Sequence, residues 1–522
     1  MGSVDPVVEN SGGTLPVFLR DAARQHPQGL ALVEGTVRLT YAELDAAADK
    51  LEASFRAMGI GRGDVIAVQL PNWWEAAVVF HAAMRLGCVI NPIVTIYRDA
   101  EVGFILAQAK AKLILLPDHF RNFDYAAMMG RIRAADVDPI IVLVRCDRPL
   151  PPDTLDFEDL LGGEKAEPVH AADPDDVTLL LYTSGTTGEP KGVLHSHRTL
   201  INENRAMIEW FGLDVRDNIF MASPVTHITG FLYGILLPPM LGSAVVLQDV
   251  WDPAKAFELI ADEACRFTVG ATPFLRELTD ECQRRQAGPG LRYFVCGGAD
   301  VPPALVENAR ATTGAQVMRV YGSSECPTVS CGSPTDTVEA LADTDGRPMP
   351  GIEVRIDGPA GEAGELLVRG PELFLGYFDA RLNQDSFDAD GFFRTGDLVR
   401  IGADGLITVT GRKKDIIIRG GENISAKEIE DLLVRHPKVA EVAIVAMPHA
   451  RLGETVCAFV VPALPDDPPT LADLLEILTS AGLARQKYPE HLEVVSAMPV
   501  TASGKIKKNE LRNLIAKEYA RN

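Results

Sequence analysis

The first half of the chain alternates helix-like and strand-like segments, and this alternation limits the possible folds more than any other feature. Apolar residues at helical spacing predict helices over 39–60 and 75–87, while short continuous apolar runs predict strands over 65–70 and 88–93. Glycine-containing turns separate these segments. Strands and helices that alternate at such lengths favour parallel sheets covered by helices.

The pattern changes twice in the second half. From about residue 345, short strands joined by glycine-rich turns predict an antiparallel sheet or a small barrel. After about residue 412 the order is helix, strand, strand, helix and strand, which predicts a compact α+β unit of about a hundred residues. The polar, proline-containing span 163–176 is a predicted linker.

Composition excludes several classes of function. The 522 residues include 50 Lys and Arg against 72 Asp and Glu, so the net charge is −22. A field of this sign repels polyanions and argues against a nucleic-acid binder or an anionic-membrane binder. It leaves room for a small anionic ligand in a local basic pocket.

Eight cysteines are scattered without any C-x-x-C pair, so a zinc site or a redox motif is not supported. In a chain of this length they suggest reduced core residues of a cytosolic protein. The first residues form neither a basic nor an apolar region of the kind found in secretory signals. We therefore expect a cytoplasmic location.

One stretch, Ile228 to Leu247, carries no charge and is long enough to resemble a membrane span. Two prolines and three glycines interrupt it. We interpret it as a buried helix, a turn and a buried strand, and expect no integral membrane association.

The most informative segment is LLLYTSGTTGEPKG, residues 179–192, in which an apolar strand runs into a loop of small residues. Its glycines let the backbone approach an anion closely, and the loop N–H groups can point inward as a nest. Hydroxyl groups and the charge of Lys191 add further contacts. This composition suits a triphosphate, although it is not a Walker A loop, because Gly188 and Lys191 are not adjacent.

This segment resembles the phosphate loop of the adenylate-forming superfamily, which includes acyl-CoA synthetases, aryl-CoA ligases, peptide-synthetase adenylation domains and firefly-type luciferases. Further motifs match in the family's order over nearly all of residues 12–517. They are Gly-Gly-Ala at 297–299, Tyr-Gly-Ser-Ser-Glu at 321–325, Arg-Thr-Gly-Asp at 394–397, the hinge and following loop at 411–424, and VTASGKI at 500–506.

The resemblance implies a fold class of α/β and α+β. A large N-terminal domain, residues 1–412, is expected to contain two parallel-type αβ-layered sheets plus a small β-barrel-like subdomain, and to bind ATP and the acyl substrate. A small mobile α+β C-terminal domain, residues 413–522, is expected to carry the catalytic lysine and a CoA-side loop.

The resemblance also implies the nucleotide site. Tyr321 is expected to stack on adenine, Asp397 to accept the ribose hydroxyls, and Glu325 to bind Mg²⁺, which prefers oxygen ligands. Ser324 replaces the family's usual threonine but keeps the hydroxyl. The implied nucleotide-binding residues are Thr183, Ser184, Gly185, Thr186, Thr187, Gly188, Lys191, Gly297, Gly298, Ala299, Tyr321, Gly322, Ser323, Ser324, Asp397 and Arg412.

Attack of a carboxylate on the α-phosphate brings two anions together, so catalysis depends on positioning and charge neutralisation. By resemblance, Lys505 bridges these groups during adenylation, and Thr186, Glu325 and His227 complete the catalytic set.

Lys414 falls at the family's hinge, where rotation is expected to remove Lys505 and to bring in Gly420, Gly421 and Glu422 beside a pantetheine tunnel. The two glycines also suit a tight strand-to-helix turn, and the two interpretations are compatible. The implied cofactors are ATP, Mg²⁺ and coenzyme A as cosubstrate.

The motif from His227 to Gly230, together with Phe231, resembles the family's acyl pocket, although a lone histidine is equally a satisfied core residue. Relatives that activate amino acids place an aspartate near this point, and residues 223–242 contain none. The apolar run is therefore expected to line a pocket for an acid without an amine. His195 and His197 lack a metal-ligand partner and are expected to be structural.

Three hypotheses follow. The first is an AMP-forming acyl-CoA ligase for a medium-chain, alicyclic, aryl or bulky carboxylic acid. The second is an acid-adenylating enzyme that loads a carrier protein in trans or releases acyl-AMP. The third is a luciferase-like oxygenase or an inert acyl-nucleotide-binding protein. Oligomeric state is open, with a homodimer possible.

Overall fold

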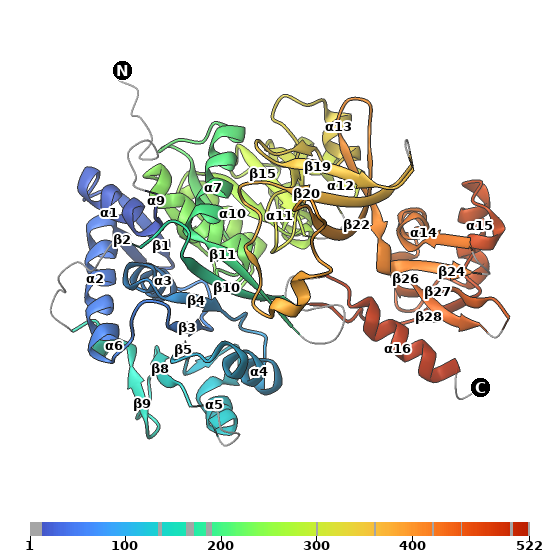
Figure 1. Ribbon diagram of the computed structural model, residues 1–522. Helices are drawn as coiled ribbons and strands as arrows, with labels where there is room; N and C mark the ends of the chain where they lie inside the picture. The colour runs from blue at the N-terminus through green and yellow to red at the C-terminus, as the bar shows by residue number, and fades with distance from the viewer. Residues whose placement is uncertain are drawn as a thin grey trace. The chain divides into compact units, whose positions relative to one another are not determined.

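The computed structural model describes residues 13–133, 138–162, 172–183, 190–298, 301–359, 362–419, 422–449, 451–501 and 505–519. Packing divides the chain into two compact units (Figure 1). Unit 1 comprises Met1–Ile352 and Arg369–Asp385, and unit 2 comprises Glu353–Val368 and Ser386–Asn522. The sequence analysis places a domain boundary at residue 412, where the C-terminal domain is expected to rotate. This division by packing does not test that boundary, which stays a prediction.

The first sheet of unit 1 is parallel in its centre and has antiparallel strands at both edges. In spatial order its strands are β18 (Arg347–Pro348), β17 (Ser330–Cys331), β16 (Gln316–Tyr321), β15 (Tyr293–Gly297), β14 (Cys265–Gly270), β12 (Asn218–Met221), β13 (Val245–Leu247), β1 (Leu30–Glu34) and β2 (Val37–Thr40). The central strands are buried, as continuous apolar runs require.

The second sheet of unit 1 is parallel from β10 to β9 and antiparallel at its other edge. Its spatial order is β21 (Gly376–Tyr377), β11 (Lys191–Ser196), β10 (Val177–Thr183), β4 (Val89–Pro92), β3 (Val65–Val68), β5 (Leu113–Pro117), β8 (Ile140–Val144) and β9 (Thr154–Asp156). The strands predicted over 65–70 and 88–93 are confirmed as neighbours in this sheet.

Helices cover these sheets, as the alternation predicts (Figure 1). The helices of unit 1 with eight or more residues are α1 (Leu15–Gln25), α2 (Tyr41–Ala57), α3 (Trp74–Leu86), α4 (Asp99–Ala109), α5 (Tyr125–Arg133), α7 (His197–Phe211), α10 (Pro253–Asp262), α11 (Thr272–Arg285) and α12 (Pro303–Thr313). Residues of α10, α11 and α12 pack on the first sheet, and residues of α4 and α5 pack on the second. The helix α3 is buried from Glu75 onward and ends at Gly87, whose φ of 70° suits a left-handed C-cap.

The uncharged stretch Ile228–Leu247 is buried inside unit 1, as predicted. It forms α8 (Ile228–Gly230), the π-helix η2 (Phe231–Leu236), α9 (Leu237–Leu241) and then β13, with a left-handed turn at Gly242. Within the described ranges, no helix is both long enough and apolar enough to cross a membrane.

Unit 2 begins with a four-stranded sheet whose strands are β19 (Glu353–Asp357), β20 (Gly364–Arg369), β22 (Phe393–Ile401) and β23 (Ile407–Arg412). The pairs β20–β22 and β22–β23 are antiparallel, which confirms the antiparallel alternative of the sequence prediction.

The rest of unit 2 is the predicted α+β arrangement. Its sheet contains β25 (Glu422–Ser425), β24 (Ile416–Arg419), β27 (Gly453–Pro462), β26 (Val439–His449) and β28 (His491–Val494). Alternate residues of β26 and β27 face opposite sides. One side packs on α14 (Ala426–Leu433) and α15 (Leu471–Ser480), and the other packs on α16 (Lys508–Tyr519). The predicted fold class is confirmed.

All eight cysteines are free thiols, and seven of them are buried. Burial raises the pKa of the Cys88 thiol to about 12, and the pKa of Cys296 is raised to about 12 for the same reason. Such thiols are unreactive packing groups. The expectation of scattered, reduced core cysteines is therefore confirmed.

Candidate nucleotide site

The predicted phosphate loop begins and ends on two paired strands of unit 1. Thr183 ends β10, Lys191 begins β11, and the two residues are antiparallel partners. The Thr183 hydroxyl donates to the Lys191 carbonyl oxygen at 3.5 Å. The ends of the loop are thus held beside each other. The predicted residues Ser184, Gly185, Thr186, Thr187 and Gly188 lie outside the described residues.

A short strand, β21, brings a residue that the sequence analysis missed against Lys191. The ammonium nitrogen of Lys191 lies 5.2 Å from the ring centroid of Tyr377, within reach of a cation–π contact. The backbone N–H of Phe378 donates to the Gly192 carbonyl at 2.8 Å. A larger residue at 192 would crowd its neighbours, because a Cβ there would lie 2.8 Å from Leu180 Cδ1 and 3.1 Å from Phe378 Cβ.

The segment Tyr321–Glu325 leaves the end of β16 as a tight, partly exposed loop. The predicted nucleotide residues Gly322, Ser323 and Ser324 lie in it. At Gly322 a Cβ would lie 2.0 Å from the Pro327 carbonyl oxygen, so only glycine fits. The Ser323 N–H donates to the Cys326 carbonyl at 2.9 Å, and the Ser323 hydroxyl accepts from the Glu325 N–H at 3.2 Å.

His195 ties this loop to β11. Its Nε2–H donates to the Ser324 carbonyl at 2.7 Å, which leaves Nδ1 facing the Thr199 hydroxyl at 3.0 Å. Full burial lowers the pKa of His195 to about 4, so the ring is neutral at pH 7. The expectation of a structural histidine fits this contact, which also fixes the backbone next to Glu325.

Glu325 is held from two sides. Its Oε1 accepts from the Tyr377 hydroxyl at 2.7 Å, and its carbonyl accepts from the Phe374 N–H at 2.8 Å. Burial and the Glu325 carboxylate raise the pKa of Tyr377, so its hydroxyl stays a donor at pH 7. Within the described ranges, Oε2 of Glu325 has no hydrogen-bond or ion-pair partner.

This arrangement fits a magnesium ion. The described residues contain no group of three or more His, Cys, Asp and Glu side chains that could hold a metal. Mg²⁺ in nucleotide sites commonly takes one or two carboxylates and completes its shell with phosphate oxygens and water. A single carboxylate with one oriented oxygen, as at Glu325, provides that ligand.

Gly297 and Gly298 end the strand next to β16. Gly297 lies opposite Val320, and a Cβ at Gly297 would sit 2.3 Å from the Val320 carbonyl oxygen. Gly298 has φ +84°, which favours glycine. These residues and Tyr321 therefore share the carboxyl edge of two parallel strands, the usual ligand side of such sheets. Ala299 lies outside the described residues.

The predicted acyl-pocket residues occupy the start of the buried helical stretch. His227 precedes α8, and its Nδ1 accepts from the Thr229 N–H at 3.4 Å. At Gly230 a Cβ would lie 2.1 Å from the Pro224 carbonyl oxygen. Phe231 is fully buried, edge-on to Phe80 at 5.2 Å. The pocket role of these residues stays a prediction.

A buried polar network joins this helical stretch to the Glu325 loop. Oε1 of Glu203 accepts from the Tyr233 hydroxyl at 2.5 Å and from the Thr328 hydroxyl at 2.7 Å. Glu372 is 1% exposed, and neither of its carboxyl oxygens has a hydrogen-bond partner among the described residues. Burial and the neighbouring Glu203 raise the pKa of Glu372 to about 9, so it is protonated at pH 7.

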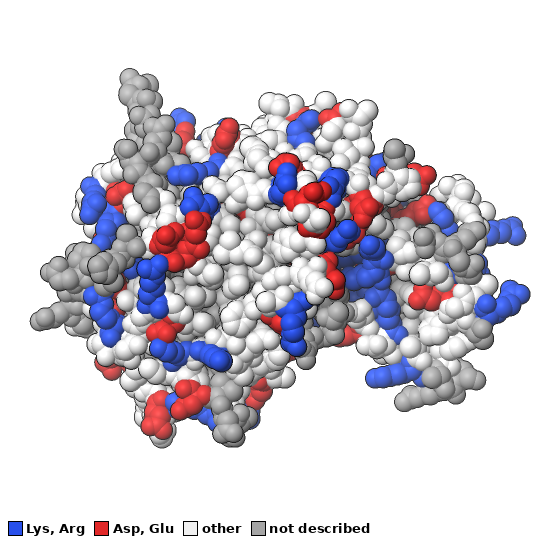
Figure 2. All heavy atoms as spheres, viewed as in Figure 1, with Lys and Arg blue, Asp and Glu red and all other residues white. Residues whose placement is uncertain are grey.

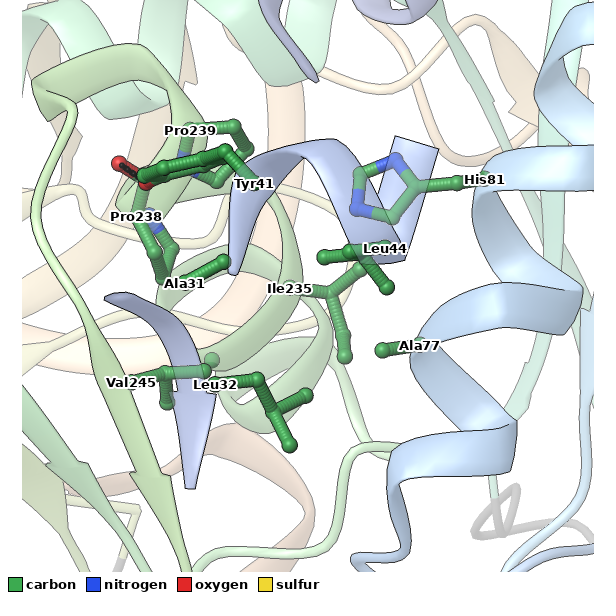
Figure 3. Close-up of a pocket in the computed structure, with 11 residues that line it drawn as sticks. Ala31, Leu32, Tyr41, Leu44, Ala77, His81, Ile235, Pro238, Pro239 and Val245 are labelled. Carbon is green, nitrogen blue, oxygen red and sulfur yellow. Dashed lines mark hydrogen bonds between the residues drawn. The ribbon is translucent and has the colours of Figure 1, made fainter. Parts of the chain in front are cut away.

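A small cavity of about 10 Å³ lies at the other end of the helical stretch (Figure 3). Gly234, Ile235, Pro238 and Pro239 contribute to its wall. The His81 ring also borders it, and burial lowers the pKa of His81 to about 3. The volume suits about one water molecule. It is not a pocket for a carboxylic acid.

Unit 2 carries the other predicted nucleotide residues. Asp397 on β22 and Arg412 on β23 are cross-strand partners, and Nε of Arg412 lies 2.8 Å from Oδ1 of Asp397. Asp397 is 4% exposed, and it follows Gly396, whose φ of 71° lies within β22 where the pairing with β20 shifts register. The structure thus brings together two residues that the sequence assigned to one ligand.

The predicted hinge residue has basic neighbours. Nη2 of Arg512 on α16 donates to the Lys414 carbonyl at 3.4 Å and forms an ion pair with Asp415. Desolvation of the ammonium and the nearby Arg412 lower the pKa of Lys414 to about 8. Figure 2 shows Lys and Arg side chains gathered on the face of unit 2 that carries α16.

Lys505 lies just before α16. Its N–H donates to the Thr501 hydroxyl at 3.0 Å, and the Thr501 N–H donates to the Lys505 carbonyl at 2.7 Å. Val500 and Ile506 form an antiparallel bridge beside these two residues. Gly420, Gly421 and the side chain of Glu422 lie outside the described residues.

Comparison with known proteins identifies the family. Residues 19–378 match the family described as AMP-binding enzyme, and residues 428–505 match its C-terminal domain. The chain belongs to the AMP-binding enzyme family. The resemblance to adenylate-forming enzymes is thereby confirmed, and with it an enzyme that uses ATP.

Individual relatives in this family cover nearly the whole chain. The medium-chain fatty-acid–CoA ligase of Escherichia coli (strain K12) is 33% identical over 96% of this chain and 90% of that protein. The 2,3-dihydroxybenzoate-AMP ligase of Bacillus subtilis (strain 168) is 34% identical over 97% of this chain and 95% of that protein. The crystal structure of ATP-bound MatB from Rhodopseudomonas palustris has a TM-score of 0.86 at 27% identity, over 98% and 100% of the two chains.

Proposed function

We propose that this AMP-binding enzyme is an AMP-forming acyl-CoA ligase. One observation carries the first half-reaction: the Tyr377 side chain contacts the ammonium of Lys191 with its ring and the carboxylate of Glu325 with its hydroxyl. A cation and a metal-binding carboxylate are thereby fixed together beside the ends of the phosphate loop. Positive charge fixed in this way is what the approach of a carboxylate to a phosphate requires.

In the first half-reaction a carboxylate oxygen of the acid attacks the α-phosphorus of ATP. The bond between the α-phosphorus and the bridging oxygen breaks, and pyrophosphate leaves. Lys191 and the loop 183–188 hold phosphate oxygens, and Glu325 holds Mg²⁺, whose charge offsets that of the phosphates when it is bound. Asp397 accepts hydrogen bonds from the ribose hydroxyls, and Arg412 orients it.

In the second half-reaction the thiol sulfur of CoA attacks the acyl carbonyl. The thiol loses its proton, the carbonyl-to-phosphate oxygen bond breaks, and AMP leaves. We propose that the C-terminal domain rotates about Lys414 between the two steps. Rotation withdraws Lys505, which bridges acid and phosphate during adenylation, and presents Gly420, Gly421 and Glu422 to the pantetheine arm.

The proposed substrate is a medium-chain, alicyclic, aryl or bulky acid that lacks an α-amine. Residues 223–242 contain no acidic side chain to pair with an amine. The two named relatives act, by their names, on a medium-chain fatty acid and on dihydroxybenzoate, and both substrates lack an amine. These facts support the class but not one acid.

A second candidate is loading of a carrier protein in trans. The Bacillus relative is named an AMP ligase rather than a CoA ligase, and its identity to this chain is as high as that of the CoA ligase. Both candidates share the first half-reaction and differ only in the thiol that accepts the acyl group.

The test uses the purified enzyme with Mg-ATP and a panel of fatty acids, cyclohexanecarboxylate, benzoates, a polycyclic acid and amino acids. Each acid is run alone, with CoA, and with a phosphopantetheinylated carrier protein, and products are identified by mass spectrometry. We expect acyl-AMP without a thiol and acyl-CoA with CoA. Acyl-AMP that ignores CoA but acylates the carrier would contradict the ligase proposal and favour the second candidate.

A further inference from the structure

Tyr377 lies where three segments far apart in the sequence meet. The strand β21 pairs with β11 through Val193–Tyr377 and Leu194–Gly376. The neighbouring Phe374 donates its N–H to the carbonyl of Glu325. One short segment therefore joins the strand that follows the phosphate loop to the loop that carries the metal-binding carboxylate.

The position of Tyr377 is fixed by more than this pairing. Its backbone N–H donates to Asn383 Oδ1 at 2.8 Å, and its carbonyl accepts from Asn383 Nδ2 at 3.3 Å. Its ring packs edge-on against Phe374 with centroids 5.0 Å apart. The side chain is 6% exposed. Its hydroxyl and its ring face are thus held in place before any ligand binds.

The two polar contacts of Tyr377 determine how the Glu325 carboxylate and the Lys191 ammonium are available to a ligand. The hydroxyl occupies Oε1 of Glu325, so Oε2 is the oxygen left for a metal. The ring face attracts the Lys191 ammonium at 5.2 Å, which holds that cation near the carboxylate without an ion pair between them. A direct Lys–Glu ion pair would cancel the charges that the nucleotide and the metal need.

We propose that Tyr377 is a positioning residue for Mg-ATP. Its hydroxyl orients the Glu325 carboxylate toward the metal, and its ring separately holds Lys191 for the phosphates. The inference rests on the proposed function, because it concerns the ATP-binding step. Hydrogen-bond partners of metal-binding carboxylates commonly change metal affinity or activity 10- to 100-fold when removed.

The two contacts can be separated by substitution. Tyr377→Phe keeps the ring and removes the hydroxyl, whereas Tyr377→Leu removes both. The matched control is Tyr125→Phe, because Tyr125 at the start of α5 is also buried and its hydroxyl donates to the Thr95 carbonyl at 2.8 Å, away from Glu325 and Lys191. Thermal unfolding of all three variants reports any general loss of stability.

The readout is binding rather than turnover. Free Mn²⁺ is followed by electron paramagnetic resonance in the presence of the non-cleavable analogue α,β-methylene-ATP, and binding of the metal-free analogue is followed by calorimetry. We expect Tyr377→Phe to weaken Mn²⁺ binding about 10-fold and to leave metal-free analogue binding unchanged. Tyr377→Leu should weaken metal-free binding as well, about 2- to 5-fold, through the freed Lys191.

The outcomes distinguish this inference from the proposed function. Equal Mn²⁺ affinity in wild type, Tyr377→Phe and Tyr125→Phe would overturn the positioning role alone. Equal loss of metal and metal-free binding in Tyr377→Phe would also overturn it, because the hydroxyl would then act on the whole site. A wild-type protein that binds no Mn²⁺–analogue complex would contradict the proposed function itself.

Discussion

Unit 1 and unit 2 hold their predicted functional groups in different ways. In unit 1, Glu325 is held by hydrogen bonds to its side chain and its backbone, and the adjacent Ser324 is held by the buried His195. In unit 2, the backbone of Lys505 is held by Thr501 and by the bridge between Val500 and Ile506. Groups that must be preorganised for charge neutralisation are thus braced from several elements. Lys505, which we propose leaves the site between half-reactions, belongs to the other unit.

Among the variants that test this comparison, Glu325→Gln is expected to have the largest effect. The amide removes the charge that attracts the metal but keeps the shape and the contact with Tyr377. We expect acyl-AMP formation to fall about 100- to 1000-fold, the range seen for loss of one preorganised electrostatic group. Pyrophosphate release measures it. A loss under 10-fold would show that Glu325 is not the metal ligand.

Asp397→Asn tests the nucleotide residues predicted in unit 2. The substitution weakens the contact with Arg412 and removes the charged acceptor for the ribose hydroxyls. Charge-assisted hydrogen bonds contribute about 1.5–3 kcal/mol each, so we expect KM for ATP to rise at least 10-fold. Steady-state kinetics at saturating acid measures the change. An unchanged KM would contradict the ribose role.

Thr328→Val tests whether the buried hydrogen bonds of Glu203 stabilise the segment that follows the Glu325 loop. Removing the hydroxyl leaves the buried Glu203 carboxylate with Tyr233 as its one remaining donor among the described residues. We expect the free energy of unfolding to fall by about 1–3 kcal/mol. Denaturant titration measures it.

The matched control for that variant is Thr279→Val. Thr279 is equally buried, but its hydroxyl donates only to the Leu275 carbonyl of its own helix, at 2.6 Å. Its removal leaves no buried carboxyl group without a donor, so a loss of under about 1 kcal/mol is expected. Equal losses in the free energy of unfolding of the two variants would show that the hydrogen bonds of Glu203 do not stabilise this segment.

Glu372→Gln is expected to change the free energy of unfolding by an amount that depends on pH. The pKa of Glu372 is raised to about 9 in the folded protein from an ordinary value near 4.5. The folded state therefore binds more protons than the unfolded state between these values, and the stability contribution of Glu372 falls as pH rises.

Because glutamine does not titrate, the stability of Glu372→Gln relative to wild type should rise between pH 5 and pH 8. The expected slope is up to about 1 kcal/mol per pH unit. Denaturant unfolding at several pH values measures it. A difference between the two proteins that does not vary with pH would show that Glu372 is ionised when folded.

Much of the fold could be predicted from local patterns. The alternation over 39–93 gave neighbouring parallel strands and a covering helix that ends at Gly87, because apolar periodicity and a glycine C-cap act locally. The π-helix at Phe231–Leu236 could not be predicted. All of its residues are buried, so it has no exposed polar face whose spacing would reveal the helical period.

The site residues that could be predicted from the sequence belong to local motifs. Tyr321 and Glu325 lie on one loop, and Asp397 and Arg412 are found as partners. The contacts of Tyr377 and His195 depend on a two-residue strand and on long-range packing, which sequence spacing does not reveal. The glycine before Tyr377 has φ +128°, a conformation that favours glycine but that the sequence alone does not reveal.

The central claim is that unit 1 serves both half-reactions while unit 2 supplies a different group to each. The most direct test measures two rates in each variant: acyl-AMP formation, and thioester formation from supplied acyl-AMP. The variants are Lys505→Ala and Gly421→Leu, with Lys507→Ala as the surface control. The account predicts that Lys505→Ala loses adenylation at least 100-fold and keeps thioester formation. It predicts the reverse for Gly421→Leu, by obstruction of the thiol tunnel. Equal loss of both half-reactions in both variants would contradict it.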